Sequence, residues 1–222
     1  MSIRVVLADD HGTVRSGLKA LLERAEGIEV VGEASDGAAA VVNARALRPD
    51  VVLMDVRMPV VDGVAATREI VSEGTAAVLV LTTFDEDEVV LSAIRAGAAG
   101  FLLKTAEATE LVSAVRRVAA GEGVVAPEVT RRVFRELATA GARVSPAEDG
   151  QAAAQLEHLT VRERDVLTQL GAGASNSQLA RELGISEATA KTHVSRVLAK
   201  LGVQSRTQAA LVARDAGLMD ST

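Results

Sequence analysis

The stretch from Val51 to Gly63 joins an apolar strand to an acidic side chain that could do chemistry. Val51–Met54 is a short apolar run rich in β-branched residues, which is typical of a strand buried on both faces of a parallel sheet. Asp55 follows directly, and an ionised carboxylate in such a place is costly unless something compensates its charge. Open α/β sheets place ligands and reactive groups at the carboxyl ends of their strands. We therefore interpret Asp55 as a reactive group, the alternative being an aspartate that only caps the next helix.

Further chemistry-bearing side chains follow other apolar runs. Asp9 and Asp10 end the first run, Thr82 ends the fourth and Lys104 the fifth. Three carboxylates in one pocket would repel one another strongly without a cation, and hard oxygen ligands of this kind favour Mg²⁺. A hydroxyl, an ammonium and a metal ion around one aspartate form a site for a phosphoryl group, with Asp55 as the nucleophile. The three histidines, His11, His158 and His193, show no metal-ligand spacing, and none is interpreted as a ligand.

These side chains can meet only if the first half of the chain alternates strands and helices. The apolar patterns predict strands at 3–8, 28–34, 51–54, 77–81 and 100–103, and helices around 14–22, 36–47, 64–72, 85–96 and 106–120. Five βα units predict an α/β fold, a (βα)5 doubly wound parallel sheet of the flavodoxin-like order 2-1-3-4-5. The first and third strands are then neighbours at the switch point, which brings their acids together.

Composition limits the classes of protein to consider. A chain of 222 residues indicates two domains, and 48% hydrophobic with 24% charged residues is ordinary for a soluble globular protein. The chain has no cysteine, no signal-peptide pattern and no membrane-length apolar run, so we expect a cytoplasmic protein without a membrane partner. The acidic excess lies before residue 126, whereas residues 156–222 hold eight basic and seven acidic residues. Only the carboxyl-terminal part could approach nucleic acid without an electrostatic penalty.

Residues 1–121 resemble a response-regulator receiver domain. The resemblance rests on LADD (Leu7–Asp10), LMDVRMPVVDG (Leu53–Gly63), LTT (Leu81–Thr83) and GFLLK (Gly100–Lys104). It implies that Asp55 takes a phosphoryl group from a sensor histidine kinase. It also implies site roles for further residues: Mg²⁺ ligands Asp9, Asp10, Asp55 and the backbone carbonyl of Arg57, phosphoryl contacts from Thr82 and Lys104, and an aromatic switch at Phe101.

One departure from the receiver pattern follows Lys104. Thr105 stands where many receivers have proline, which leaves open whether the Lys104–Thr105 peptide is cis. A cis bond before a residue other than proline costs about 3 kcal/mol.

Residues 122–155 are interpreted as a linker, in which 140–155 have few large apolar side chains and no periodic pattern. Within it, Pro127 can open a short helix at 127–138. The alternative is an extra helix packed on the receiver.

Residues 156–222 carry only helix signals and predict a small all-α domain. Thr160 and Glu163 form a capping-box pattern, and Ser175 begins a second helix. A tight turn at Gly184 then leads to a longer helix capped by Ser186. One face of this helix carries small polar and basic residues that suit DNA bases and phosphates, which favours a helix-turn-helix. The alternative is a generic helical bundle with a solvated charged face.

This domain resembles the LuxR-type DNA-binding domain. The resemblance rests on LTVRERDVL (Leu159–Leu167) and SNSQLARELGISEATAKTHVSRVLAKLGVQSRTQAA (Ser175–Ala210), with Val161 where the family usually has proline and Ala190 where a larger aliphatic is common. It implies a recognition helix over Ser186–Leu201 and a final helix, Thr207–Arg214, that pairs with its twin in a dimer. The implied residues are Lys191, Thr192 and Ser195 at base edges, Asn176, Thr189, His193 and Arg196 near phosphates, and Thr207, Ala210, Leu211 and Arg214 in the dimer.

Together these resemblances predict a two-component response regulator of the NarL/FixJ type, which is not an enzyme. Such a protein accepts a phosphoryl group on Asp55 and binds double-stranded promoter DNA as a homodimer to control transcription, with RNA polymerase as a further candidate partner. The alternative is a DNA-binding regulator that works without phosphorylation and uses its receiver only for dimerisation or ligand sensing. A phosphatase with an aspartate nucleophile is disfavoured, because His11 rather than an aspartate lies two residues after Asp9.

Overall fold

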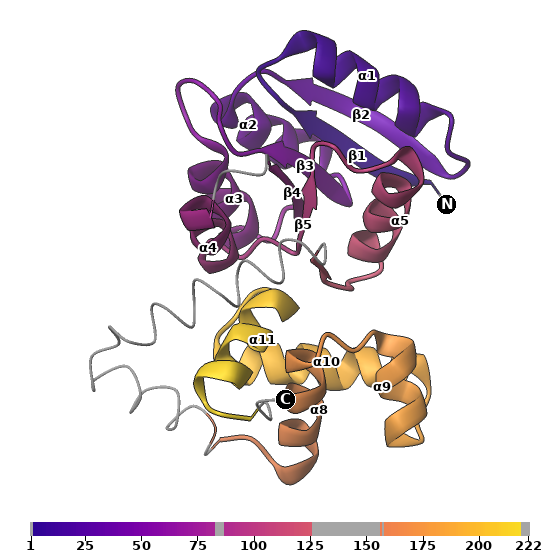
Figure 1. Cartoon of the computed structure of the whole chain (residues 1–222), viewed down its shortest axis with the longest axis vertical. Coiled ribbons are helices and arrows are strands. Elements are labelled where there is room, and N and C mark those ends of the chain that lie inside the picture. Colours follow the sequence, from indigo (N-terminus) through magenta and orange to yellow (C-terminus); the bar gives the residue numbers. More distant parts are fainter. Residues whose placement is uncertain (1, 83–86, 126–155, 157, 219–222) are drawn as a thin grey trace. The chain divides into compact units, whose positions relative to one another are not determined.

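The computed structural model describes residues 2–82, 87–125, 156 and 158–218, which form two compact units on either side of the segment 126–155 (Figure 1). Of the predicted linker, 122–155, only residues 122–125 are described, and Val124 and Val125 pair with the sheet of the first unit, so the linker begins later than predicted. The helix predicted at 127–138 lies outside the described residues. Within the described part of the chain, no helix is both long and apolar enough to cross a membrane.

The first unit is a parallel sheet with helices on both faces (Figure 1). Its strands are β1 (Ile3–Ala8), β2 (Ile28–Ala34), β3 (Val51–Asp55), β4 (Ala77–Thr82), β5 (Gly100–Leu103) and β6 (Val124–Val125). Its helices are α1 (Gly12–Glu23), α2 (Gly37–Leu47), α3 (Gly63–Ser72), α4 (Asp87–Arg95) and α5 (Ala108–Ala119). The order β2-β1-β3-β4-β5 confirms the predicted topology, and every residue of β3 is buried, as its continuous apolar run indicated.

A sixth strand was not predicted. Val124 and Val125 pair in parallel with Gly100 and Phe101 at the edge of β5. Two residues are too few to show a strand period in the sequence. The pairing gives the backbone of β5 a hydrogen-bonding partner on its outer side, so tertiary contact rather than local pattern creates this strand.

Local sequence fixes how the loops leave the sheet near Asp55. Asp62 caps α3 by accepting a hydrogen bond from Ala65 N at 2.8 Å, so Asp55 is not the cap of the following helix. Gly63 begins α3 against β3, and a Cβ there would come within 2.0 Å of the carbonyl oxygen of Asp55. Only glycine fits at this approach, and the helix start is thereby held directly under the end of β3.

The second unit contains four helices, α8 (Val161–Gly171), α9 (Asn176–Leu183), α10 (Glu187–Leu201) and α11 (Arg206–Asp215). Thr160 with Glu163 forms the predicted capping box. Two further capping boxes, Ser175 with Gln178 and Ser205 with Gln208, were not predicted, although Ser175 was predicted to begin a helix. Gly184 ends α9 with φ of 64°, a left-handed conformation that glycine adopts without strain and that turns the chain into α10. The aliphatic core includes Val166, Leu167, Leu170, Leu179, Val194, Val197 and Leu201.

Candidate phosphoryl-acceptor site and nucleic-acid surface

The predicted site residues of the first unit meet at the carboxyl edge of the sheet. Asp55 is the last residue of β3 and Thr82 the last of β4, while Asp9 and Lys104 follow β1 and β5 directly. All these strands are parallel, so their carboxyl ends lie at one edge (Figure 1). The parallel register therefore assembles groups that are up to 95 residues apart in the sequence.

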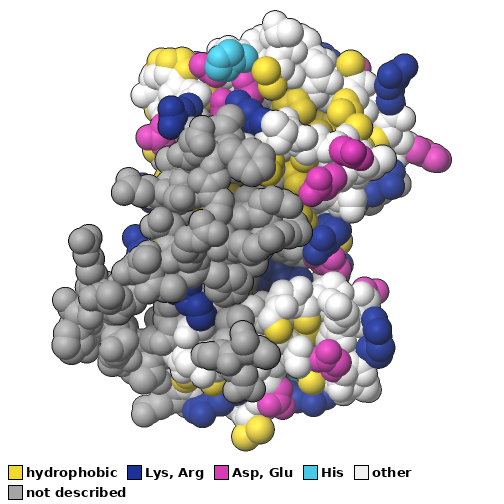
Figure 2. Space-filling view, viewed as in Figure 1, with side chains coloured by type: hydrophobic (Ala, Val, Ile, Leu, Met, Phe, Trp, Pro, Cys, Tyr) yellow, Lys and Arg dark blue, Asp and Glu magenta, His cyan; other side chains and the backbone are white. Residues whose placement is uncertain are grey.

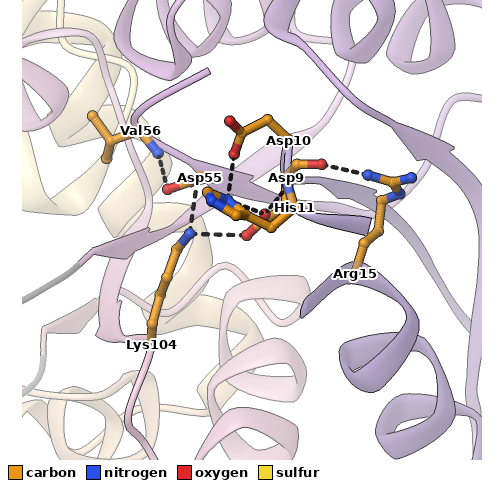
Figure 3. A network of polar contacts seen from close by, with 7 residues as sticks. All are labelled: Asp9, Asp10, His11, Arg15, Asp55, Val56 and Lys104. Carbon is orange, nitrogen blue, oxygen red and sulfur yellow. Dashed lines mark hydrogen bonds and ion pairs between the residues drawn. The ribbon is translucent and has the colours of Figure 1, made fainter. Parts of the chain in front are cut away.

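Lys104 lies between two buried carboxylates (Figure 3). Its Nζ is 2.8 Å from Asp55 Oδ2 and 2.9 Å from Asp9 Oδ2. Asp55 is 5% exposed and Asp9 1% exposed, so water screens neither charge well. One ammonium cannot neutralise two carboxylates, and the pocket keeps an excess of negative charge.

Burial raises the pKa of Asp55, because the charged carboxylate is poorly solvated, and the nearby charge of Asp9 raises it further. The hydrogen bond from Lys104 and that from Val56 N at 2.7 Å act in the opposite direction without cancelling the shift. Burial alone would lower the pKa of Lys104, but its hydrogen bonds to Asp55 and Asp9 outweigh burial and the pKa is raised. Lys104 therefore stays an ammonium ion, and Asp55 would gain from a further cation.

Asp10 and His11 complete an acidic cluster with Asp9 and Asp55. His11 Nδ1 is 2.7 Å from Asp10 Oδ1, and the backbone N–H of His11 donates to Asp9 Oδ1 at 2.8 Å. One ligand atom from each of these four residues lies within 4.8 Å of the others. The three histidines show no metal-ligand spacing, and the position of His11 beside these acids was not predicted. The one sequence feature that pointed to this position of His11 is that it directly follows Asp9 and Asp10.

Other predicted residues lie at the same edge. Thr82 is 1% exposed, and its backbone carbonyl accepts a hydrogen bond from Lys104 N at 2.8 Å. Phe101 is fully buried in the sheet beneath this edge, opposite Val80 of β4. Arg57 follows Asp55 by two residues in the loop that leads to α3. The Lys104–Thr105 peptide is trans, so threonine at this position introduces no cis bond.

Helix α10 presents a polar face over a buried stripe. Ala190, Val194, Val197 and Leu201 are buried, whereas most of the residues predicted to contact DNA are exposed: Thr189, Lys191, Thr192, Ser195 and Arg196. His193 is only partly exposed.

Two residues of the predicted DNA and dimer sets are more buried than expected. Asn176 is 2% exposed, and its Oδ1 has no hydrogen-bond partner among the described residues. Thr207 is 9% exposed, while Ala210, Leu211 and Arg214 remain partly exposed. Both side chains lie in the first turn of a helix. The sequence indicates where the helix begins, but not which neighbouring residues cover these side chains.

Comparisons with known proteins match both units. The family model of the response regulator receiver domain matches residues 5–116, and that of the luxR family of bacterial regulatory proteins matches residues 157–213. The chain is 42% identical over 212 residues to the transcriptional regulatory protein LiaR of Bacillus subtilis, covering 95% of this chain and 96% of LiaR. It is 39% identical over 214 residues to the response regulator protein VraR of Staphylococcus aureus, covering 96% and 97%. The crystal structure of the response regulator ChrA, from a heme-sensing two-component system, is similar with 40% identity, 98% coverage of both chains and a TM-score of 0.55.

Proposed function

This chain belongs to the transcriptional response regulators that join a receiver domain to a LuxR-type DNA-binding domain, and on that premise we propose that Asp55 is its phosphoryl acceptor. The observation that carries the proposal is the Lys104 ammonium held between Asp55 and Asp9 at the carboxyl edge of the sheet. The proposed donor is a sensor histidine kinase.

In the proposed reaction, a carboxylate oxygen of Asp55 bonds to phosphorus as the bond from phosphorus to the kinase histidine nitrogen breaks. The Lys104 ammonium, already oriented toward Asp55 Oδ2 at 2.8 Å, neutralises charge on the phosphoryl oxygens. The hydroxyl of Thr82 is the proposed hydrogen-bond donor to one of these oxygens, and Phe101 the aromatic residue that follows Thr82.

The donor set fits a magnesium ion. Asp9, Asp10 and Asp55 supply hard carboxylate oxygens within 4.8 Å of one another, and the backbone carbonyl of Arg57 is the proposed fourth ligand. When bound, Mg²⁺ supplies positive charge against the carboxylates and the phosphoryl oxygens.

Phosphorylation replaces the single negative charge of the Asp55 carboxylate with a phosphoryl group of about −1.5 to −2 charges next to Lys104 and Thr82. We propose that this change shifts the α4–β5–α5 face, which then either dimerises or releases the DNA-binding domain. Lys191, Thr192 and Ser195 are the proposed base contacts, and Thr189, His193 and Arg196 the proposed phosphate contacts. Two recognition helices would then read double-stranded promoter DNA at half-sites about 10 bp apart. We propose a cytoplasmic location, because the proposed function acts on promoter DNA.

The side chains of Asn176 and Thr207 are buried, so their proposed roles differ from those of the exposed residues. Asn176 is covered, so its phosphate contact would come from its backbone amide at the start of α9. Ala210, Leu211 and Arg214 are the proposed dimer surface, with Thr207 supporting them from within the unit.

The test is a titration of the full-length protein with beryllofluoride and Mg²⁺, followed by light scattering and promoter-DNA binding, with Asp55→Asn as the matched control. We expect the wild type to dimerise and to bind DNA more tightly, and Asp55→Asn to show neither response. Identical mass and affinity with and without beryllofluoride in the wild type would instead favour a regulator that works without phosphorylation.

A further inference from the structure

Arg15 of α1 contacts the backbone of the proposed metal site and has no part in the function proposed above. Its Nη1 donates a hydrogen bond to the carbonyl oxygen of Asp9 at 2.6 Å (Figure 3), and its Nε donates to Glu33 Oε2 at 3.2 Å. The side chain is only 21% exposed, so it is held against the first unit rather than extended into solvent.

The carbonyl oxygen of Asp9 needs a donor because the sheet ends beside it. The N–H of Asp9 donates to the carbonyl oxygen of Ala34 at 3.1 Å, and Ala34 is the last residue of β2. A longer β2 would supply the next hydrogen bond of the ladder to Asp9. Asp9 is 1% exposed, and a buried carbonyl oxygen without a donor costs free energy. The Arg15 guanidinium therefore replaces a strand hydrogen bond at the carboxyl edge of the sheet.

Holding this carbonyl also holds the residue that follows it. The peptide bond is planar, so the carbonyl oxygen of Asp9 and the N–H of Asp10 turn together. Asp10 is exposed, and Figure 2 shows acidic side chains beside a histidine at the surface of the first unit, so packing contributes little to the position of the Asp10 carboxylate. The direction of its backbone then decides whether this carboxylate points toward those of Asp9 and Asp55.

Arg15 is itself anchored by β2. The Glu33 carboxylate accepts hydrogen bonds from Arg15 and, at 2.8 Å, from Lys19 Nζ. The backbone of Glu33 is held from α2, because Asn43 Nδ2 donates to its carbonyl oxygen at 2.9 Å. The guanidinium thus links a fixed point of β2 to the Asp9–Asp10 peptide.

We propose that Arg15 is a positioning residue for Mg²⁺ binding: by holding the Asp9–Asp10 peptide, it directs the Asp10 carboxylate toward the ion and lowers the Mg²⁺ concentration that phosphorylation of Asp55 needs. The inference rests on the proposed function, which supplies the ion and the phosphoryl group. The sign of the effect separates positioning from charge. A cation close to three carboxylates opposes Mg²⁺ binding, so loss of Arg15 would strengthen binding if its charge dominated. Loss of a supporting hydrogen bond weakens binding instead.

The first test measures the Mg²⁺ affinity of the full-length wild type, Arg15→Ala and the matched control Arg45→Ala by isothermal titration calorimetry. Arg45 also pairs with carboxylates, those of Glu69 and Glu73, but on the surface between α2 and the end of α3. We expect Arg15→Ala to raise the Mg²⁺ dissociation constant about tenfold, at the lower end of the 10–100-fold cost of losing a supporting contact at a metal site. Arg45→Ala should bind Mg²⁺ as the wild type does.

The second test separates ion binding from the chemistry. The rate of phosphorylation by acetyl phosphate is measured across a series of Mg²⁺ concentrations, with the phosphorylated protein counted by mass spectrometry. In Arg15→Ala the half-maximal rate should need about ten times more Mg²⁺. The rate at saturating Mg²⁺ should match the wild type, because Asp55, Thr82 and Lys104 are unchanged. A damaged fold would instead lower the rate at saturating Mg²⁺.

Four results would overturn the inference: equal Mg²⁺ affinity in wild type and Arg15→Ala, tighter binding in Arg15→Ala, an equal loss in Arg45→Ala, or a lower maximal rate with an unchanged Mg²⁺ dependence. Failure of the proposed function is separate, since it appears as a wild type that acetyl phosphate does not modify at any Mg²⁺ concentration. The affinities from the first test would still decide the role of Arg15 in that case.

Discussion

At the level of single residues, the site holds more negative than positive buried charge. Lys104 contacts both Asp9 and Asp55, and its single positive charge cannot balance both buried carboxylates. Such a pocket costs free energy of folding until another cation enters or the charge is removed. This cost in folding stability agrees with the proposed Mg²⁺ site. If the pocket already neutralised its carboxylates fully, an added cation would gain little by binding there.

Asp55→Asn should stabilise the metal-free protein at pH 7. The pKa of Asp55 is raised above 3.8 in the folded protein, so the native state binds this proton more tightly than the unfolded chain does. The stability of the wild type therefore falls as pH rises from about 3.8 through the raised pKa, and the asparagine variant avoids that loss. Urea unfolding followed by circular dichroism should show a gain at pH 7 that disappears below pH 3.8. A gain of equal size at both pH values would contradict this explanation.

Replacing Val60 with glycine should raise the free energy of unfolding of the protein. Its φ of 67° lies in the left-handed region, which costs a residue with a Cβ about 1–2 kcal/mol, and its side chain is 87% exposed, so little packing is lost. Glycine also raises the conformational entropy of the unfolded chain, which offsets part of this gain and leaves a net stabilisation of about 0.5–1 kcal/mol. The measurement is urea unfolding of Val60→Gly beside Val60→Ala, which keeps the Cβ. Equal stability of the two variants would show that the backbone angle is not the cause.

At the scale of elements, side-chain caps determine where the helices begin. Thr160, Ser175 and Ser186 were predicted as helix starts and are the N-caps of α8, α9 and α10. Caps and apolar periods act within a few residues, which is why sequence alone was sufficient for these boundaries. Glu163 also accepts a hydrogen bond from Lys200 at 2.6 Å, and this contact lowers the pKa of Glu163 to about 2. That contact joins α8 to α10 and could not be read from either helix pattern.

Val161→Pro should stabilise the second unit by about 0.5–1 kcal/mol. Val161 is the first residue of α8 and is 80% exposed, and an amide at this position has no partner within the helix. Thr160 has φ of −67° and ψ of 163°, the extended conformation that a residue before proline prefers. Proline therefore restricts the unfolded chain without disturbing the folded one. Hydrogen exchange of the core amides of α10 measures the gain, with Val161→Ala as control; faster exchange in the proline variant would show that the cap is disturbed.

At the scale of the whole molecule, the two units carry different charge. The acidic excess lies in the receiver, and the near-neutral helical unit carries the proposed DNA surface. A single near-neutral unit makes few phosphate contacts, so tight binding depends on doubling them in a dimer.

Arg196→Ala should weaken binding of the beryllofluoride-activated dimer to all DNA sequences alike. Each lost phosphate contact lowers the slope of log affinity against log salt by about 0.9, so a dimer should lose about 2. Lys191→Ala, at a proposed base contact, should instead cost about 1–3 kcal/mol at the specific site only. DNA binding measured across a salt series tests both. A slope change of about 1 for Arg196→Ala would indicate that only one recognition helix engages phosphates.

Local sequence patterns were enough to identify the residues that could do chemistry and the order of the helices and strands. Apolar runs ending in Asp9, Asp55, Thr82 and Lys104 indicated the strands and their reactive ends, because strand period and chain order are local properties. The contacts that those groups make could be seen only in the folded protein. Lys104 between two acids, the two-residue β6 and the covered side chain of Asn176 all depend on distant neighbours. A local pattern shows which face of an element is apolar, but only the packed fold sets which atoms come within contact distance.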